Sequence, residues 1–229
     1  MNLMPENIST YGGDLDSLTR VITYFAVIWF LAAFGVMAWF LFKYRKGANK
    51  KAAYITGGNL KELKYILFFL ILVILSDFYI DVLTVGVWDR IKIQVPTADV
   101  KVGIFAYQWN WAFNYPGPDG QFGTSDDVRT PDNVFHVPVN KNIVFDLASK
   151  DVLHSFWVKE LRLKQDAVPG RIIKGWFNAT KIGKYEIMCA EICGIMHSAM
   201  KGYLVVESEE DYNKFLDSLY HPKVGINLK

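Results

Sequence analysis

Residues 21–42 contain no charged side chain and are almost entirely apolar. A helix needs about 20 such residues to cross the hydrocarbon core of a bilayer. The alternative, a core helix of a soluble protein, is disfavoured by this length. Asp14, Asp16 and Ser17 precede the run, and the polar, acidic start of the chain predicts no secretory signal peptide. The chain is therefore expected to be anchored in a membrane by a first span over residues 21–42.

A second apolar run covers about residues 65–88, with Trp88 as an expected anchor at the membrane interface. Asp77 and Asp81 lie within it, four residues apart and therefore on one helical face. Ionisable groups inside a span are expected to face protein or water, which predicts that this face packs against another membrane subunit. The alternative is that the span ends early and Asp81 already reaches the outer interface.

The connection between the two runs is rich in basic residues, and cytoplasmic loops carry an excess of such residues. This pattern places the connection in the cytoplasm and both termini on the opposite side. Residues 1–90 are therefore predicted to form an N-terminal segment and a two-helix anchor. The basic residues are Lys43, Arg45, Lys46, Lys50, Lys51, Lys61 and Lys64.

From residue 91 to residue 229 the chain changes to short β-branched or alternating segments separated by turns. Several short strands at regular spacing predict a β-sandwich or barrel. Residues 209–220 predict one closing helix, with Ser208 as its N-cap. The predicted strands are residues 100–105, 133–138, 142–147, 152–158, 171–177, 184–188 and 202–207.

The chemistry concentrates in residues 189–200, Cys-Ala-Glu-Ile-Cys-Gly-Ile-Met-His-Ser-Ala-Met, which hold both cysteines of the chain. Thiolate and imidazole ligands favour copper, zinc or iron–sulfur, and a thioether favours copper. One cysteine, one histidine and one methionine with a distant histidine match a blue-copper site. The second cysteine exceeds that set, and two thiolates can instead bridge two copper ions. A disulfide, a zinc site with two cysteines and two histidines, and a methionine that only fills the core are the plainer alternatives.

A second histidine ligand must come from elsewhere in the chain. His154 lies in an apolar, strand-like run and is the best candidate by context. His136 is flanked by apolar residues, and His221 lies beyond the last packed element, so both are weaker candidates.

These motifs together resemble subunit II of cytochrome c oxidase. The resemblance rests on His154-Ser-Phe-Trp, on Lys164-Gln-Asp-Ala-Val-Pro-Gly-Arg, on Gly183-Lys-Tyr and on the loop from Cys189 to Met200. It also includes the two N-terminal spans and the aromatic run Tyr-Gln-Trp-Asn-Trp over residues 107–111, and so covers most of the chain. The family implies a cupredoxin-like domain (a Greek-key sandwich or barrel) outside the membrane, holding a dinuclear copper centre.

The resemblance also implies the ligands of two copper ions. Cys189 and Cys193 would bridge both ions, while His154 and His197 would each bind one. Met200 would be a weak axial ligand to one ion, and the backbone carbonyl of Glu191 to the other. The Glu191 side chain would bind magnesium or manganese at the boundary with the catalytic subunit.

Further roles follow from the resemblance rather than from the residues alone. Trp109 would be the surface residue at which electrons enter from cytochrome c, although its neighbour Asn110 replaces a frequent aromatic. By their alternating spacing alone, the aromatic residues of this segment form one face of a strand, for which core packing is the usual explanation. They are Tyr107, Trp109, Trp111, Phe113 and Tyr115.

Four charged residues also match family positions. Asp151 would assist docking of cytochrome c, while Asp166 and Arg171 would support the subunit boundary. Glu62 matches a glutamate at the cytoplasmic mouth of a proton pathway. The match around Glu62 is short, and the tryptophan and prolines usual in that helix are missing, so a solvated glutamate remains an equal alternative.

The resulting hypothesis is an electron-transfer subunit of a haem–copper oxidase, part of an oxidoreductase complex rather than the oxygen-reducing chain itself. Its expected partners are cytochrome c, the haem-bearing subunit I and other oxidase subunits. We expect an inner bacterial membrane with the C-terminal domain in the periplasm, and a mitochondrial location remains an alternative. A net charge of +2 with no basic block gives no indication of nucleic-acid binding.

Other classes of protein fit less well. A copper-free subunit II of a quinol oxidase shares fold and topology but would not need the five copper ligands. A membrane-anchored copper carrier would favour exposed methionine or histidine clusters, and a nitrous oxide reductase would need a further catalytic domain.

Residues 116–133 form a loop rich in glycine, proline and aspartate without an apolar period. Asp119, Asp126 and Asp127 offer the oxygens that calcium prefers, although no EF-hand spacing is present. A solvated acidic loop, which steers a basic partner by charge, is the alternative.

Overall fold

The structure is a computed structural model that describes residues 4–47, 56–130 and 133–221. It divides into two compact units. One lies within residues 14–90 and contains the two long helices, and the other joins the chain up to Gly13 with the chain from Ile91 onward. The sequence-based division placed residues 1–90 together, so the segment before the first helix is grouped differently in the structure.

The helical unit contains both predicted spans. Helix α1 covers Gly12–Lys43 and helix α2 covers Leu60–Trp88. Both are long and apolar enough to cross a membrane. Helix α1 begins before the apolar run, since the polar residues around Asp14 are also helical. Asn59 is the N-cap of helix α2, and its side chain accepts a hydrogen bond from the Lys61 N–H. A short π-helical turn, η1 (Asp89–Ile93), follows the helix. Lys50 and Lys51 of the basic connection lie outside the described residues.

Polar contacts join α1 to α2 and to the η1 turn that follows it. The indole N–H of Trp29 donates to the Ser76 hydroxyl at 3.2 Å, and Arg90 pairs with Asp14 at 3.0 Å. Asp77 and Asp81 both lie on the exposed surface of α2. The interpretation that they face another membrane subunit therefore stays a prediction.

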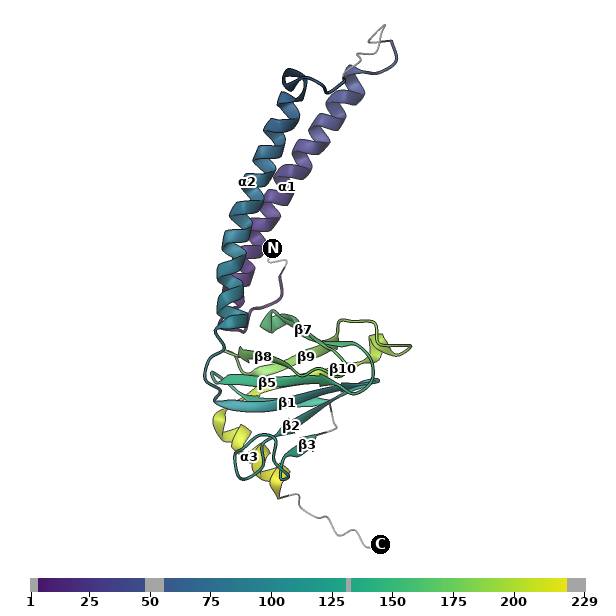
Figure 1. Cartoon of the computed structure of the whole chain (residues 1–229). Coiled ribbons are helices and arrows are strands. Elements are labelled where there is room, and N and C mark those ends of the chain that lie inside the picture. The colour runs from purple at the N-terminus through teal and green to yellow at the C-terminus, as the bar shows by residue number, and fades with distance from the viewer. Residues whose placement is uncertain (1–3, 48–55, 131–132, 222–229) are drawn as a thin grey trace. The chain divides into compact units, whose positions relative to one another are not determined.

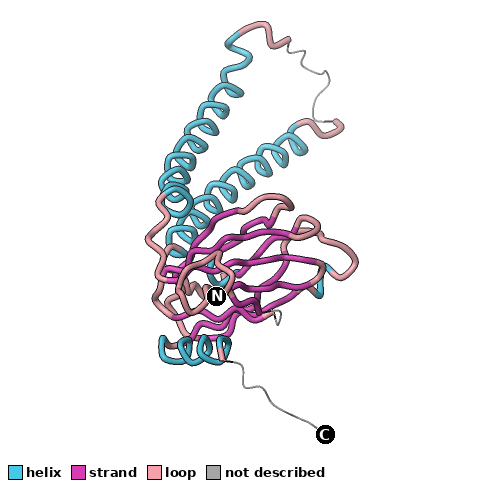
Figure 2. The backbone as a smooth tube through the Cα atoms, turned by 60° about the horizontal axis from the view of Figure 1, so that its bottom comes forward, coloured by secondary structure: helices cyan, strands magenta, loops and turns pink. Residues whose placement is uncertain are grey.

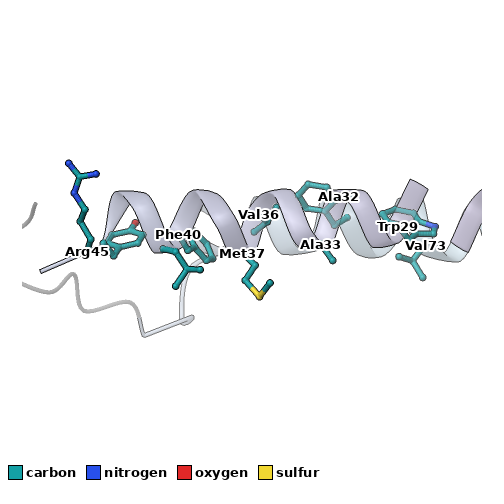
Figure 3. Close-up of a pocket in the computed structure, with 11 residues that line it drawn as sticks. Trp29, Ala32, Ala33, Val36, Met37, Phe40, Arg45 and Val73 are labelled. Atoms are coloured by element: carbon teal, nitrogen blue, oxygen red, sulfur yellow. The ribbon is translucent and has the colours of Figure 1, made fainter. Parts of the chain in front are cut away.

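An apolar groove of about 850 Å³ runs along the pair of helices (Figure 3). Trp29, Val36 and Phe40 of α1 line it together with Val73 of α2, and Arg45 lies at one end. Apolar side chains that would be exposed to water here are expected of helices that face lipid or other spans.

The other unit is built from two five-stranded sheets, whose strands are visible in Figures 1 and 2. The first sheet has the order β3-β2-β1-β5-β8 and the second has the order β4-β10-β9-β6-β7. One neighbouring pair in each sheet is parallel, β1 with β5 and β4 with β10, and the other pairs are antiparallel. The strands are β1 (Val100–Tyr107), β2 (Asn110–Tyr115), β3 (Val128–Thr130), β4 (Val134–Pro138), β5 (Asn142–Ser149), β6 (His154–Val158), β7 (Leu163–Ala167), β8 (Ile173–Asn178), β9 (Gly183–Cys189) and β10 (Lys201–Glu207).

Aromatic side chains fill the space between the two sheets. Phe113 of β2 stacks on Phe135 of β4 with ring centroids 4.6 Å apart, and Trp111 meets Phe156 of β6 edge to face at 5.5 Å. Such pairs add to the burial of apolar area, and their alternation along the strands produces one buried face per sheet. The predicted β-sandwich is confirmed by this arrangement.

Two details of the strand prediction are wrong. The aromatic run does not form a single strand, because the chain turns at residues 108–109 between β1 and β2. Trp111, Phe113 and Tyr115 are buried in the core, whereas Tyr107 and Trp109 are only half-buried. Strands β3 and β7 were not predicted, since β3 is very short and β7 mixes charged and apolar residues.

The closing helix agrees with the prediction. Helix α3 covers Glu209–Tyr220, and the Ser208 hydroxyl accepts a hydrogen bond from the Asp211 N–H as an N-cap. Phe215 of this helix stacks on the ring of His136, with ring centroids 4.0 Å apart. This contact ties α3 to strand β4.

The segment before α1 is part of the β-rich unit. Ile8 is fully buried, its N–H donates to the Glu160 carbonyl, and its carbonyl accepts from the Thr180 N–H. Ser9 forms a β-bridge with Ala179, and the Arg162 guanidinium donates to backbone carbonyls of residues 5 and 6. These contacts explain why the first residues group with the chain after residue 90.

Candidate metal centre

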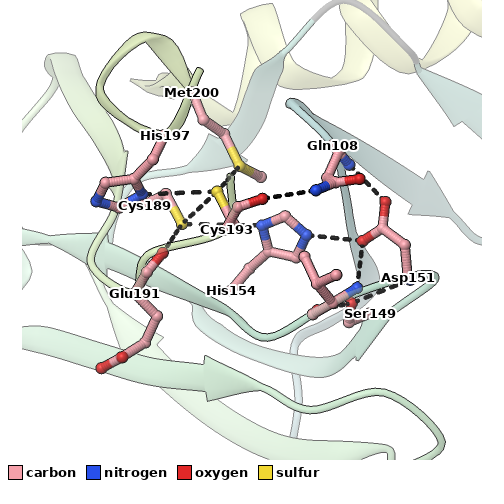
Figure 4. Close-up of polar contacts among 10 residues, drawn as sticks. Gln108, Ser149, Asp151, His154, Cys189, Glu191, Cys193, His197 and Met200 are labelled. Carbon is pink, nitrogen blue, oxygen red and sulfur yellow. Dashed lines mark hydrogen bonds and ion pairs between the residues drawn. The ribbon is translucent and has the colours of Figure 1, made fainter. Parts of the chain in front are cut away.

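Five side chains with nitrogen or sulfur donors converge at one end of the sandwich (Figure 4). His154 begins β6 and Cys189 ends β9, and these strands are neighbours in one sheet. Cys193, His197 and Met200 come from the loop that joins β9 to β10. The backbone closes this loop with a hydrogen bond from the Cys189 N–H to the Met200 carbonyl, so both ends of the loop return to the same place.

The two sulfurs of the cysteines lie at the middle of the group, 3.8 Å apart. The Nδ1 atom of His154 is 3.8 Å from the Cys189 sulfur, and the Nδ1 atom of His197 is 3.5 Å from the Cys193 sulfur. The Met200 sulfur is 3.7 Å from the Cys193 sulfur. Each histidine therefore lies beside a different cysteine.

The donor atoms fit a metal. Those of His154, Cys189 and Cys193 all lie within 4.8 Å of one another. Metal–thiolate bonds are about 2.3 Å long at zinc, so two sulfurs at this separation can share one ion. Both cysteines are free and buried, so the disulfide alternative is not present in the structure. The carbonyl of Glu191 lies 3.2 Å from the Cys189 sulfur and adds an oxygen donor.

Most donor side chains of the site are buried. His154 is completely buried, and Cys193 and Met200 are almost so. Burial raises the pKa of Cys193 to about 11, and the adjacent Cys189 thiol adds to this shift. A cation would replace the thiol protons, because metals bind the thiolate form. Trp111 meets the His154 ring edge to face and forms part of the apolar surround.

Asp151 orients His154. Its carboxylate lies 2.8 Å from His154 Nε2, which leaves Nδ1 on the side of Cys189. The same carboxylate accepts the N–H groups of Gln108 and Val152, both at 2.7 Å. Partial burial opposes ionisation, yet these hydrogen bonds keep the pKa of Asp151 below its ordinary value. Carboxylates of this kind fix the ring and tautomer of metal-binding histidines. The predicted docking residue is thus turned toward the metal site.

The β1–β2 turn covers another side of the loop. The side-chain amide of Gln108 donates to the Cys193 carbonyl at 2.7 Å. Gly194 has a φ of +126°, and a Cβ atom there would lie 3.0 Å from the Gln108 amide and 3.2 Å from the Trp109 indole. Glycine therefore allows the loop to lie directly against Trp109. The sequence contained Gln108 within the aromatic run but gave no signal for its role.

Glu191 points away from the sulfurs and joins a small charged cluster. Lys164 lies 3.0 Å from the Glu191 carboxylate and 3.4 Å from that of Asp166. Asp166 also accepts a hydrogen bond from the Ser155 hydroxyl at 2.8 Å. The pKa of Lys164 is raised, first by the hydrogen bond to Glu191 and then by Asp166. The structure thus brings Asp166 and Glu191 together through a lysine that sequence reasoning missed.

The remaining predicted residues lie apart from this group. Arg171 is exposed after a turn, and Glu62 accepts a hydrogen bond from the Gly57 N–H at the start of α2. His136 pairs with Glu207, and His221 is exposed at the end of α3. Among the four histidines, His154 and His197 are therefore the two at the sulfurs.

The carboxylates of the acidic loop are hydrogen-bonded within the loop itself. Asp126 accepts hydrogen bonds from Thr124 and from the Asp119 N–H, and Asp127 accepts from the Gly123 N–H. These bonds hold the loop together with its own donors. Calcium binding there stays a prediction, and residues 131–132 of this loop lie outside the described residues.

Comparison with known proteins identifies relatives. A profile described as cytochrome c oxidase subunit II, periplasmic domain, matches residues 100–208. An alternative cytochrome c oxidase subunit 2 of Bradyrhizobium diazoefficiens is 30% identical over 231 residues, covering 92% of this chain and 82% of the relative. Cytochrome c oxidase subunit 2 of Thermostichus vulcanus is 37% identical over 128 residues (56% of this chain, 36% of the relative), and that of Cereibacter sphaeroides is 34% identical over 153 residues (54% and 50%). The chain thus spans half or less of these last two relatives.

One solved structure is similar over the β-rich unit. It is the periplasmic domain of subunit II of cytochrome oxidase (CoxB) of Bradyrhizobium japonicum. The similarity has a TM-score of 0.50 and 29% sequence identity, and it covers 56% of this chain and 98% of that one. The predicted cupredoxin-like fold is confirmed by this match.

Proposed function

Because the chain belongs to the cytochrome c oxidase subunit II family, a subunit of an oxidoreductase complex, we propose that it receives electrons from cytochrome c. The electrons pass through a dinuclear copper centre to haem in the catalytic subunit, where oxygen is reduced to water. The observation that carries this proposal is the pair of free, buried sulfurs 3.8 Å apart, each with its own histidine nitrogen.

Six donor groups of the site would hold the copper. Cys189, Cys193, His154 and His197 would hold two copper ions, with Met200 and the Glu191 carbonyl as further donors. Copper in a thiolate and imidazole site supplies a one-electron carrier, whose potential depends on the axial donors and on the apolar surround. Asp151 would hold His154 in place, so that little rearrangement accompanies a change of charge.

Trp109 is proposed as the residue through which electrons enter. Its indole lies against Gly194, one residue from Cys193, which supports a short path from the surface to the sulfurs. We also propose that Asp151 assists docking of the electron donor, beside its contact with His154.

Glu191, Asp166 and Arg171 are proposed to face the catalytic subunit. Magnesium or manganese at this boundary would require the Glu191 carboxylate to exchange Lys164 for the ion. The pair is half-exposed, so this exchange involves little desolvation.

The two helices and the match to a periplasmic domain support a membrane protein whose C-terminal domain lies outside the cytoplasm. We propose the inner membrane of a bacterium as its location. Glu62, at the start of α2, would then lie at the cytoplasmic side, where a role in proton uptake remains a proposal.

The proposal is tested by metal analysis and electron paramagnetic resonance of the purified full chain after copper loading. Two coppers per chain, with one unpaired electron coupled to both nuclei, are expected. Met200→Leu should change the signal, whereas Met196→Leu is a matched control because Met196 is half-exposed on the same loop. A single copper with a one-nucleus pattern would contradict the bridging roles of the cysteines. A chain that binds no copper would support the copper-free subunit of a quinol oxidase instead.

A further inference from the structure

Gln108 lies in the turn between β1 and β2 and contacts both sides of the metal centre (Figure 4). Its backbone N–H donates to the Asp151 carboxylate at 2.7 Å, and that carboxylate lies 2.8 Å from His154 Nε2. Its side-chain amide donates to the Cys193 carbonyl, also at 2.7 Å. One exposed residue thus links the carboxylate behind His154 with the backbone of a cysteine on the loop.

The middle of the metal-binding loop has few other attachments. The start of the loop is held by the sheet, since the Ala190 N–H donates to the Ser155 carbonyl at 3.1 Å. Among residues 192–199, the hydrogen bonds that the structure describes run within the loop, apart from the one that Gln108 donates to Cys193. The position of the Cys193 backbone therefore depends on the Gln108 side chain.

The residue after Cys193 gives the amide room to reach the carbonyl. Gly194 has a φ of +126°, and a Cβ atom there would lie 3.0 Å from the Gln108 amide nitrogen. A side chain at this position would crowd the amide, and the backbone conformation itself favours glycine. The loop and the turn are thus shaped for this one contact.

The separation of the two sulfurs shows what the contact controls. They lie 3.8 Å apart, whereas the sulfurs of a disulfide are about 2.0 Å apart. Cys189 belongs to strand β9, so closing the gap requires mainly a shift of Cys193 on the loop. A hydrogen bond that holds the Cys193 backbone therefore opposes disulfide formation and keeps two free thiols available to a shared metal.

We infer that Gln108 is a positioning residue of the metal centre, which keeps Cys193 at the distance from Cys189 that a shared metal requires. Through its backbone N–H it also steadies Asp151, and with it the His154 ring. The inference rests on the proposed function, since it adds a residue that organises the same copper site.

The test uses the purified full chain with Gln108→Met, which keeps the backbone N–H and the length of the side chain but loses the amide donor. After copper loading, we expect two coppers per chain with an altered hyperfine pattern in electron paramagnetic resonance. Competition with a chelator should show a copper affinity lower by about three- to tenfold, the loss expected for one hydrogen bond. Gln121→Met is the matched control, because Gln121 is exposed in the separate acidic loop.

The copper-free chain gives a second measurement, with oxidised glutathione as the oxidant. Two protein thiols and one molecule of oxidised glutathione give one protein disulfide and two molecules of reduced glutathione. We expect this disulfide to form at least about threefold faster in Gln108→Met than in the wild type or in Gln121→Met, because Cys193 has lost its hydrogen bond. The thermal midpoint of the copper-free chain should be unchanged, since the Gln108 side chain is exposed.

Two results would overturn the inference. One is an unchanged copper signal together with an unchanged rate of disulfide formation in Gln108→Met. The other is a lowered thermal midpoint in that variant with an unaltered hyperfine pattern, which would make the contact a purely structural one. The copper-free measurement separates this inference from the proposed function. Faster disulfide formation in the variant, with no two-copper signal in the wild type, refutes the function but supports the hold of Gln108 on Cys193.

Discussion

The two sides of the metal centre are constructed differently. On the strand side, His154 is fully buried in β6, and the Asp151 carboxylate holds its outer nitrogen. On the loop side, His197 is half-buried in a short turn, and its Nδ1 atom lies 3.5 Å from the Cys193 sulfur. The strand side is thus fixed by the fold, and the loop side by its own short turns.

This difference has a consequence for metal loading. Hydrogen bonds and core packing define the strand side without an ion, whereas a bound ion would add ligand bonds to the hydrogen bonds that already hold the loop side. The paired cysteines, one from the end of β9 and one from the loop, join the two sides.

The largest effect is expected from the cysteines. Cys189→Ser and Cys193→Ser should each abolish the two-copper resonance signal, because a hydroxyl does not replace a bridging thiolate. Ser198→Ala, a change in the same loop at an exposed residue, is the control. A two-copper signal that survives in Cys193→Ser would show that the loop side does not depend on the bridge.

Replacing each histidine in turn should show that the strand side contributes more to the stability of the fold than the loop side. In the copper-free chain, His154→Ala should destabilise the β-rich unit by about 2–3 kcal/mol, because it creates a buried cavity and removes the imidazole from the Asp151 carboxylate. His197→Ala should change the free energy of unfolding by less than about 0.5 kcal/mol, as for a surface residue. Thermal unfolding followed by near-ultraviolet circular dichroism, which reports on Trp111 beside His154, measures both. Equal losses of stability would contradict the comparison.

Loss of the Asp151 carboxylate should lower the affinity for copper without abolishing copper binding. Asp151→Asn is expected to lower copper affinity by about 10- to 100-fold, the usual effect of losing a carboxylate behind a metal-binding histidine. Competition with a chelator measures the affinity. Asp126→Asn serves as control because Asp126 lies in the separate acidic loop. An unchanged affinity would mean that packing alone orients His154.

The smallest effect is expected at the charged cluster of Lys164. Its pKa is raised in the folded chain, so the stabilisation is fully present below the ordinary lysine pKa and is lost only as the pH rises through the raised value. Stability should therefore be unaffected by this group between pH 6 and 9. Because the pair is half-exposed, Lys164→Met should change the free energy of unfolding by at most about 1 kcal/mol and leave copper affinity within about twofold. A large loss of copper in this variant would show that Glu191 needs Lys164 to hold its carbonyl in place.

Much of the site could be predicted from the sequence because its donors are close together in the chain. Cys189, Cys193, His197 and Met200 fall within one loop, and their chemical types already favour copper. The spans were equally visible, since hydropathy over about 20 residues is a local property. The role of His154 was harder to predict, because its sequence context favoured it over His136 but did not show that it lies near the cysteines. The pairing of β6 with β9 brings it to Cys189.

What the sequence by itself determined was thus the chemical nature of the centre, the two spans and the β-rich class of the outer unit. The tertiary structure decided the contacts that depend on register between distant strands. The parallel pairing of β1 with β5 aligns Ala106 with Ser149, and so brings Gln108 to Asp151 just beyond the strand ends. Other tertiary contacts turn Asp151 toward His154, place Trp109 against Gly194 and draw Ile8 into the β-rich unit. No local pattern encodes such contacts, because a shift of one residue in strand register would reverse which side chains face each other.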